Sequence, residues 1–469
     1  MKQRVNFLSE PQELTYVDKN RTIQLVLLGT LTITAIIGYI FRPEAVSMLY
    51  NYFCFTLFLI STFLFFLLKK KANYFDFETI FIIFLAVIGF AYSVFFYNEN
   101  DPYSIAFSLS FDTNFIPKGT MLFVLGIQAF FWGSIMAKRS TKQPTDVVTK
   151  SKIPIDNTPL TIIVILLGIA FLLSGGVSYY RSVYYFNNSD TSTGLIFQIS
   201  SLLHAFSITA IATEFYNKLV NKDARINPLL MIVLMIVITL MLYAGNRTLA
   251  SQLALPAIGL YTLFYKDIRF MKFLIFVLIA IGFMWFIQIT RVGGSISTVE
   301  DGTKLISDLT IPTRSTYSCM EYIQEYGQTW GKNLLGGLIG VVPFLERILV
   351  TTLNLDSRTL GSAEILTDYT LGPNPYVGLG TNIIADLFLS FNVYGVIFFM
   401  FCLGAFVSHY QAKAKEVDYY SIIIYSSLLS FSVYLVRTTY THPIKLIIWC
   451  LIIGLVNKSI SQKQLQKSE

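Results

Sequence analysis

Apolar segments of about 20 residues recur along this chain, and they restrict its fold more than any other feature. A helix of that length spans the hydrocarbon core of a bilayer, which is about 30 Å thick. Of the 469 residues, 54% are hydrophobic and only 13% are charged. Many tyrosines stand at the ends of the apolar segments, as is typical of membrane interfaces. The chain is therefore predicted to be an all-α polytopic membrane protein.

Hydropathy predicts about 12 transmembrane helices. They are expected near residues 22–41, 45–68, 77–97, 119–137, 159–175, 194–216, 227–244, 248–265, 271–289, 394–410, 417–436 and 443–457. Every segment that this count places on the inner side carries Lys or Arg, as the positive-inside rule requires, and both termini are then inside. Because the basic residues follow topology in this way, the net charge of +7 does not indicate a nucleic-acid partner.

The segment 333–353 is apolar but is not predicted to span the membrane. Pro343, Glu346 and Arg347 lie in its middle, where each charge costs on the order of 2.5–3.5 kcal/mol. A span here would also reverse the orientation of every later loop. We expect interfacial or re-entrant helices inside a large outer loop. The expected divisions are transmembrane helices over 1–289, an outer loop or lid over 290–379, and a polar motif with three more helices over 380–469.

The outer basic residues are mostly arginine, whereas lysine dominates on the inner side. A guanidinium group binds two phosphate oxygens at once, and a charge that only fixes orientation has no need of that geometry. Pairing with outer acidic residues or anchoring to lipid headgroups is the alternative for each arginine. The outer arginines selected as phosphate ligands are Arg247, Arg291, Arg314, Arg347, Arg358 and Arg437.

Arg247 lies in the sequence AGNRT, residues 244–248, between two predicted spans. Gly245 permits a sharp backbone turn, so these spans are expected to form a helical hairpin with the arginine at its outer mouth. Arg437 occupies the matching position before the last span, and Arg291 ends the ninth span. Three hairpin ends thus offer an arginine at similar depth, and together they would cradle a diphosphate if they converge.

Two residues are candidates for proton transfer. His442 follows the Arg437 turn, and its imidazole titrates near neutral pH; its alternative role is a contact at a helix N-terminus. If a helix begins near residue 381, Asn382, Asp386 and Ser390 form one polar stripe. Asp386 then either pairs with a polar group of the protein or accepts a proton, and pairing is the commoner role.

Metal or cofactor chemistry has little support in the sequence. The chain has no His/Cys cluster and no Gly-rich phosphate loop after a strand. Glu99 and Asp101 form an acidic pair that would suit a divalent cation, but an acidic surface turn before Pro102 explains it equally well. We therefore expect neither a metal nor a cofactor.

The order of these features resembles the Wzy-type polymerases of O-antigen, capsule and exopolysaccharide repeat units. The resemblance is carried by the many spans, the dominant outer loop late in the chain, the GNRT hairpin and the motif NPYVGLGTNIIADLFLSFNVYG. That motif is similar to the family's G-x-G, which is followed by an acidic helix and an aromatic/Asn-Gly ending. The family usually has Glu where this chain has Asp386.

The resemblance implies a class C-like membrane glycosyltransferase in the bacterial plasma membrane. It would join undecaprenyl-diphosphate-linked oligosaccharides on the outer face without a metal. The six arginines would bind diphosphate, and Asp386 or His442 would be the base. The implied partners are the lipid-linked oligosaccharide and the bilayer, with a chain-length regulator and a flippase as further partners. An O-antigen ligase is the nearest alternative, and a transporter is the more distant one, because the chain shows no internal repeat.

Overall fold

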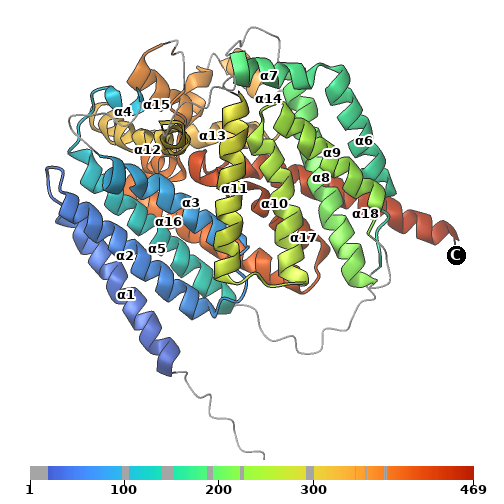
Figure 1. The fold of residues 1–469 in the computed structure, drawn as a ribbon, viewed down its shortest axis with the longest axis horizontal. Helices are drawn as coiled ribbons and strands as arrows, with labels where there is room; N and C mark the ends of the chain where they lie inside the picture. The colour runs from blue at the N-terminus through green and yellow to red at the C-terminus, as the bar shows by residue number, and fades with distance from the viewer. Residues whose placement is uncertain are drawn as a thin grey trace, which may run out of the picture.

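The computed structural model describes residues 19–97, 105–139, 153–186, 194–221, 226–291, 300–343, 345–353, 356–373, 375 and 378–468. Within these ranges every regular element is a helix, and Figure 1 shows the long helices packed side by side. Several shorter helices gather at one end of this bundle, opposite the end at which the first helix, α1 (Lys19–Ile40), begins.

The elements follow one another in four groups along the chain. After α1 come α2 (Met48–Lys69), α3 (Phe77–Phe90), the π-helix η1 (Ala91–Phe96), α4 (Ile105–Ser108) and α5 (Phe115–Arg139). The second group is α6 (Thr158–Leu173), α7 (Gly176–Phe186), α8 (Gly194–Val220), α9 (Pro228–Tyr243), α10 (Arg247–Phe264) and α11 (Phe270–Arg291). The third is α12 (Glu300–Tyr326), α13 (Lys332–Ile339), α14 (Leu345–Leu353), the 3-10 helix η2 (Ser357–Leu360) and α15 (Ser362–Leu371). The last is α16 (Ile383–Lys415), α17 (Tyr419–Phe431), the 3-10 helix η3 (Tyr434–Arg437) and α18 (His442–Ser468).

Seven of the described helices are long and apolar enough to cross a membrane, or eight if α6 and α7 count as one span bent by 56°. Shorter apolar helices at Pro228–Tyr243, Phe270–Gly282 and Tyr419–Phe431 overlap three further predicted spans. The prediction of an all-helical protein with many spans is confirmed at this level.

The centre of the bundle is the contact between α5 and α16. A Cβ atom on Gly133 would collide with the backbone carbonyl of Phe401, and one on Gly404 would collide with that of Phe130. The two glycines therefore let the backbones of α5 and α16 touch, as small residues do between membrane helices. This contact fixes α16, which carries the predicted polar stripe.

The long element α16 consists of two helices that meet at a kink, and the kink falls between the helix expected from about residue 381 and the span expected from residue 394. Phe391 and Asn392 leave helical geometry, and Asn392 has a φ of 57°. The kink leaves the Leu389 carbonyl without its usual helical donor, and both the backbone N–H and the hydroxyl of Thr329 donate to it, at 3.0 and 3.1 Å. The first part of α16 is thereby bound to the segment that follows α12.

The apolar segment 333–353 forms the short helices α13 and α14, separated by a turn. Two hydrogen bonds fasten this segment to the last part of the chain. The Thr441 hydroxyl donates to the Leu334 carbonyl at 3.1 Å, and the Trp449 indole N–H donates to the Val341 carbonyl at 2.8 Å. The segment therefore lies against the bundle beside the start of α18.

Candidate functional site

The turn between α9 and α10 brings Arg247 to the end of a helical hairpin, as predicted. Gly245 has a φ of 83°, in the left-handed region that a side chain disfavours. Asn246 then caps α10, because its side-chain oxygen accepts a hydrogen bond from the Leu249 N–H at 3.0 Å. Arg247 is consequently the first residue of α10.

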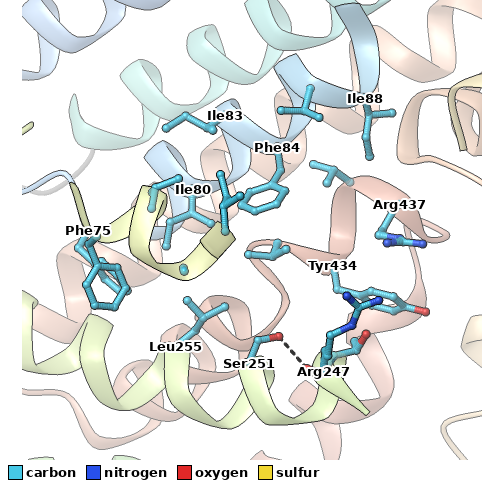
Figure 2. A pocket seen from close by; sticks show the side chains of 18 of the residues that line it. Phe75, Ile80, Ile83, Phe84, Ile88, Arg247, Ser251, Leu255, Tyr434 and Arg437 are labelled. Carbon is cyan, nitrogen blue, oxygen red and sulfur yellow. Dashed lines mark hydrogen bonds between the residues drawn. The ribbon is translucent and has the colours of Figure 1, made fainter. Parts of the chain in front are cut away.

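A cavity of about 270 Å³ lies between α3, α10, α11 and η3. Apolar side chains form most of its lining, among them Phe84 from α3, Leu255 from α10 and Phe276 from α11. Figure 2 shows Phe75 at one end of the cavity, followed by apolar residues that include Ile80, Phe84 and Leu255. An apolar chain is the chemical group that such a lining accommodates.

The other end of the same cavity is polar and cationic. Arg247 and Arg437 both line it, together with Ser251 and Tyr434, and Figure 2 shows the two guanidinium groups there beside the tyrosine ring. Two of the predicted arginines, distant in sequence, therefore converge on one cavity. The whole cavity suits a ligand with an apolar tail and an anionic head.

His442 lies beside this cavity without being among the described residues that line it. Its imidazole centroid is 5.6 Å from the ring centroid of Tyr434, which does line the cavity. Its backbone N–H donates to the Thr439 carbonyl at 3.2 Å at the start of α18, and its side chain is exposed. The Tyr434 ring thus lies between the imidazole and the two arginines.

Asp386 is fully buried, and it connects α16 to two other segments. Its Oδ1 accepts a hydrogen bond from the Asn333 amide at 2.7 Å, and its Oδ2 accepts one from the Tyr440 backbone N–H at 2.8 Å. Tyr440 belongs to the short turn between Arg437 and His442. The carboxylate therefore holds the backbone that carries both of those side chains.

The rest of the predicted polar stripe joins the same network. Asn382 caps α16 by accepting from the Ala385 N–H at 2.9 Å, and Ser390 donates to the Asn333 side-chain oxygen at 3.0 Å. Asn333 is the residue that the sequence reasoning missed. It stands in an apolar segment with no local pattern around it, so only its contacts across the fold reveal its role.

Arg314 is buried in a different place. Its guanidinium lies 4.5 Å from the Phe111 ring centroid, donates to the Ser318 hydroxyl at 2.6 Å and pairs with Glu321 at 3.5 Å. Burial lowers the pKa of this guanidinium, and the Glu321 carboxylate opposes that shift. Arg314 therefore joins α12 to the segment before α5 and is absent from the described lining of the cavity.

The remaining predicted residues are dispersed. Arg358 is exposed and pairs with Asp368 at 3.3 Å within the loop segment. Arg291 ends α11 and Arg347 lies in α14, but both side chains lie outside the part of the chain that the structure describes. The Glu99 and Asp101 pair also lies outside the described residues.

Comparison with known proteins gives one result. The family model described as O-antigen polysaccharide polymerase Wzy matches residues 22–463, nearly the whole chain. No curated protein and no solved structure gives a significant match.

Proposed function

Because the chain belongs to the O-antigen polysaccharide polymerase Wzy family, whose members join lipid-linked oligosaccharide repeat units, we propose that the cavity between α3, α10, α11 and η3 binds the lipid diphosphate of the donor. The observation that carries this proposal is the convergence of Arg247 and Arg437 at one end of an apolar cavity. The apolar body would hold the first part of an undecaprenyl chain, and the arginines would hold the diphosphate.

The chemistry follows from this placement. A hydroxyl oxygen of the incoming repeat unit forms a bond to the anomeric carbon of the growing chain, while the bond from that carbon to the phosphate oxygen breaks. The diphosphate leaves with the electron pair, and Arg247 and Arg437 stabilise the negative charge that develops on it. Guanidinium groups supply this charge permanently, so we expect the reaction to proceed without a metal.

The hydroxyl proton needs an acceptor, and we propose His442 for that role. Its imidazole lies against Tyr434 at the cationic end of the cavity. For Asp386 we propose a positioning role, because both of its oxygens already accept hydrogen bonds and one of them holds the Tyr440 N–H. Arg291, Arg314, Arg347 and Arg358 stay predictions as diphosphate ligands, and the contacts of Arg314 and Arg358 favour structural roles.

We further propose the topology that the charge distribution indicates. The seven long spans, the α6 and α7 pair, and α9, α10, α11 and α17 would together make 12 spans with both termini cytoplasmic. Residues 290–379 would then be an outer lid in a class C-like fold in the bacterial plasma membrane. A chain-length regulator and a flippase are the partners expected beside this protein.

The test is polymerisation by the purified protein in lipid nanodiscs, with lipid-linked repeat units as the sole substrate and EDTA present. We expect polymer to form without nucleotide or added metal. Activity that disappears with EDTA and returns with a divalent cation would contradict the proposed role of the arginines as the source of positive charge.

A further inference from the structure

A second cavity, open and about 250 Å³ in volume, lies where the start of α5 meets α12 and α15. It shares no described lining residue with the arginine cavity. Figure 1 shows α12 and α15 together at the end of the bundle where the short helices gather. The residues that line it are Asp112, Phe115, Glu321, Gln324, Glu325 and Tyr369.

Two aromatic residues, Phe115 and Tyr369, line this second cavity. The Tyr322 ring centroid lies 5.6 Å from that of Tyr369 and 5.0 Å from that of Tyr326. Tyr326 is 63% exposed, and its ring centroid lies 6.2 Å from that of Tyr369. An exposed ring beside the lining offers a face against which a ligand can pack.

The polar groups of the cavity are held in place by the protein. Glu321 accepts a hydrogen bond from the Asp112 backbone N–H at 2.7 Å and also pairs with Arg314. The Tyr369 hydroxyl donates to Glu325 at 3.2 Å. A carboxylate offers about four lone-pair sites, so these groups keep acceptor capacity for a ligand, as does the exposed Gln324 amide.

We infer that this second cavity binds a sugar of the oligosaccharide repeat unit, and that this sugar is neutral or carries an amino group. A pyranose offers hydroxyl donors to carboxylate and amide oxygens, and its C–H face packs on the electron-rich face of an aromatic ring. The described lining includes three carboxylates and no Lys or Arg, which disfavours a uronic acid at this position. The inference rests on the proposed function, because the sugar would belong to the repeat unit whose diphosphate binds in the arginine cavity.

Helix α12 connects the two cavities physically. The Thr313 hydroxyl donates to the carbonyl of Ile88, which lines the arginine cavity, and Glu321 on the same helix lines the second one. The helix rises about 12 Å from Thr313 to Glu321. Helix α12 therefore contributes to the position of the walls of both cavities.

The experiment measures binding of two separate probes to the protein in nanodiscs. One probe is the lipid-free repeat-unit oligosaccharide, and the other is a polyprenyl diphosphate that carries no sugar. We expect Tyr369→Ala and Gln324→Ala to weaken oligosaccharide binding at least roughly ten-fold and to leave polyprenyl diphosphate binding unchanged. Tyr369→Phe, which keeps the ring, is the matched variant and should retain most of the affinity.

Arg247→Ala separates the two proposals. It should weaken polyprenyl diphosphate binding and leave oligosaccharide binding as in the unmodified protein. The sugar site is refuted if the unmodified protein does not bind the oligosaccharide, or if Tyr369→Ala and Gln324→Ala bind it equally well. Failure of polyprenyl diphosphate binding alone would refute the arginine cavity and not the sugar site.

Discussion

Arg247 and Arg437 place two permanent positive charges at one end of a cavity whose other described walls are mostly apolar. Replacing either arginine by Ala should lower kcat/KM for polymerisation by about 10²- to 10³-fold, because the leaving diphosphate loses a preorganised donor. Arg247→Lys should lower kcat/KM by a smaller factor, because lysine keeps the positive charge but cannot bind two phosphate oxygens in the way a guanidinium group does. Initial rates with lipid-linked repeat units measure this effect.

Arg358→Ala is the matched control among the predicted arginines. Its ion pair with Asp368 is exposed, and such a pair contributes only about 0.2–1 kcal/mol to stability. Polymerisation by this variant should match that of the unmodified protein. A loss equal to that of Arg247→Ala would mean that the loop arginine also binds diphosphate.

Asp386→Asn distinguishes a positioning role from a catalytic one. The new amide would direct an N–H₂ group at one of two donors, the Asn333 amide or the Tyr440 N–H, so one buried hydrogen bond is lost. We expect a stability loss of about 1–3 kcal/mol, seen as a lower Tm, together with reduced activity. An inactive variant with an unchanged Tm would instead identify Asp386 as the base.

At the scale of helices, the contact between α5 and α16 sustains the arrangement around Asp386. Gly133→Ala should reduce the yield of monodisperse protein and lower its Tm, because its methyl group collides with the Phe401 carbonyl. Overpacking of this kind costs about 1–3 kcal/mol.

Gly282→Ala in α11 is the corresponding control, since a Cβ atom there meets no described atom within 4 Å. It should be neutral or slightly stabilising, as alanine is the better helix former. Equal losses of Tm and yield in the two variants would argue that close backbone contact is not the reason that residue 133 is glycine.

The elements differ in how far the sequence predicted them. The α9–α10 hairpin was predictable because Gly245 and the charged turn are local signals. The break at Asn392 falls between the predicted polar helix and the predicted span, but its donor, Thr329, comes from another segment and was not predictable. The convergence of Arg247 with Arg437 and the burial of Arg314 against Phe111 likewise depend on tertiary packing, which no local pattern encodes.

For the whole molecule, the orientation in the membrane can be tested by cysteine labelling. Thr359→Cys, in the proposed lid, and Lys266→Cys, between α10 and α11, both replace exposed residues. In intact spheroplasts a membrane-impermeant maleimide should label only the first, and permeabilisation should expose the second. The protein without either substitution controls for its own cysteines, of which Cys54, Cys319 and Cys450 are buried. Labelling of Lys266→Cys in intact spheroplasts would show that the protein has the opposite orientation to the one proposed.

The central claim is that the lipid diphosphate of the donor occupies the cavity at Arg247 and Arg437. Its most direct test uses a polyprenyl diphosphate with a photoreactive group in its first isoprene units, followed by mass spectrometry of the labelled peptides. Labelling is predicted on α3 and α11, around Phe84 and Phe276, and should be lost in Arg247→Ala. Labelling elsewhere in the bundle, or labelling of these helices that survives Arg247→Ala and Arg437→Ala, would contradict the account.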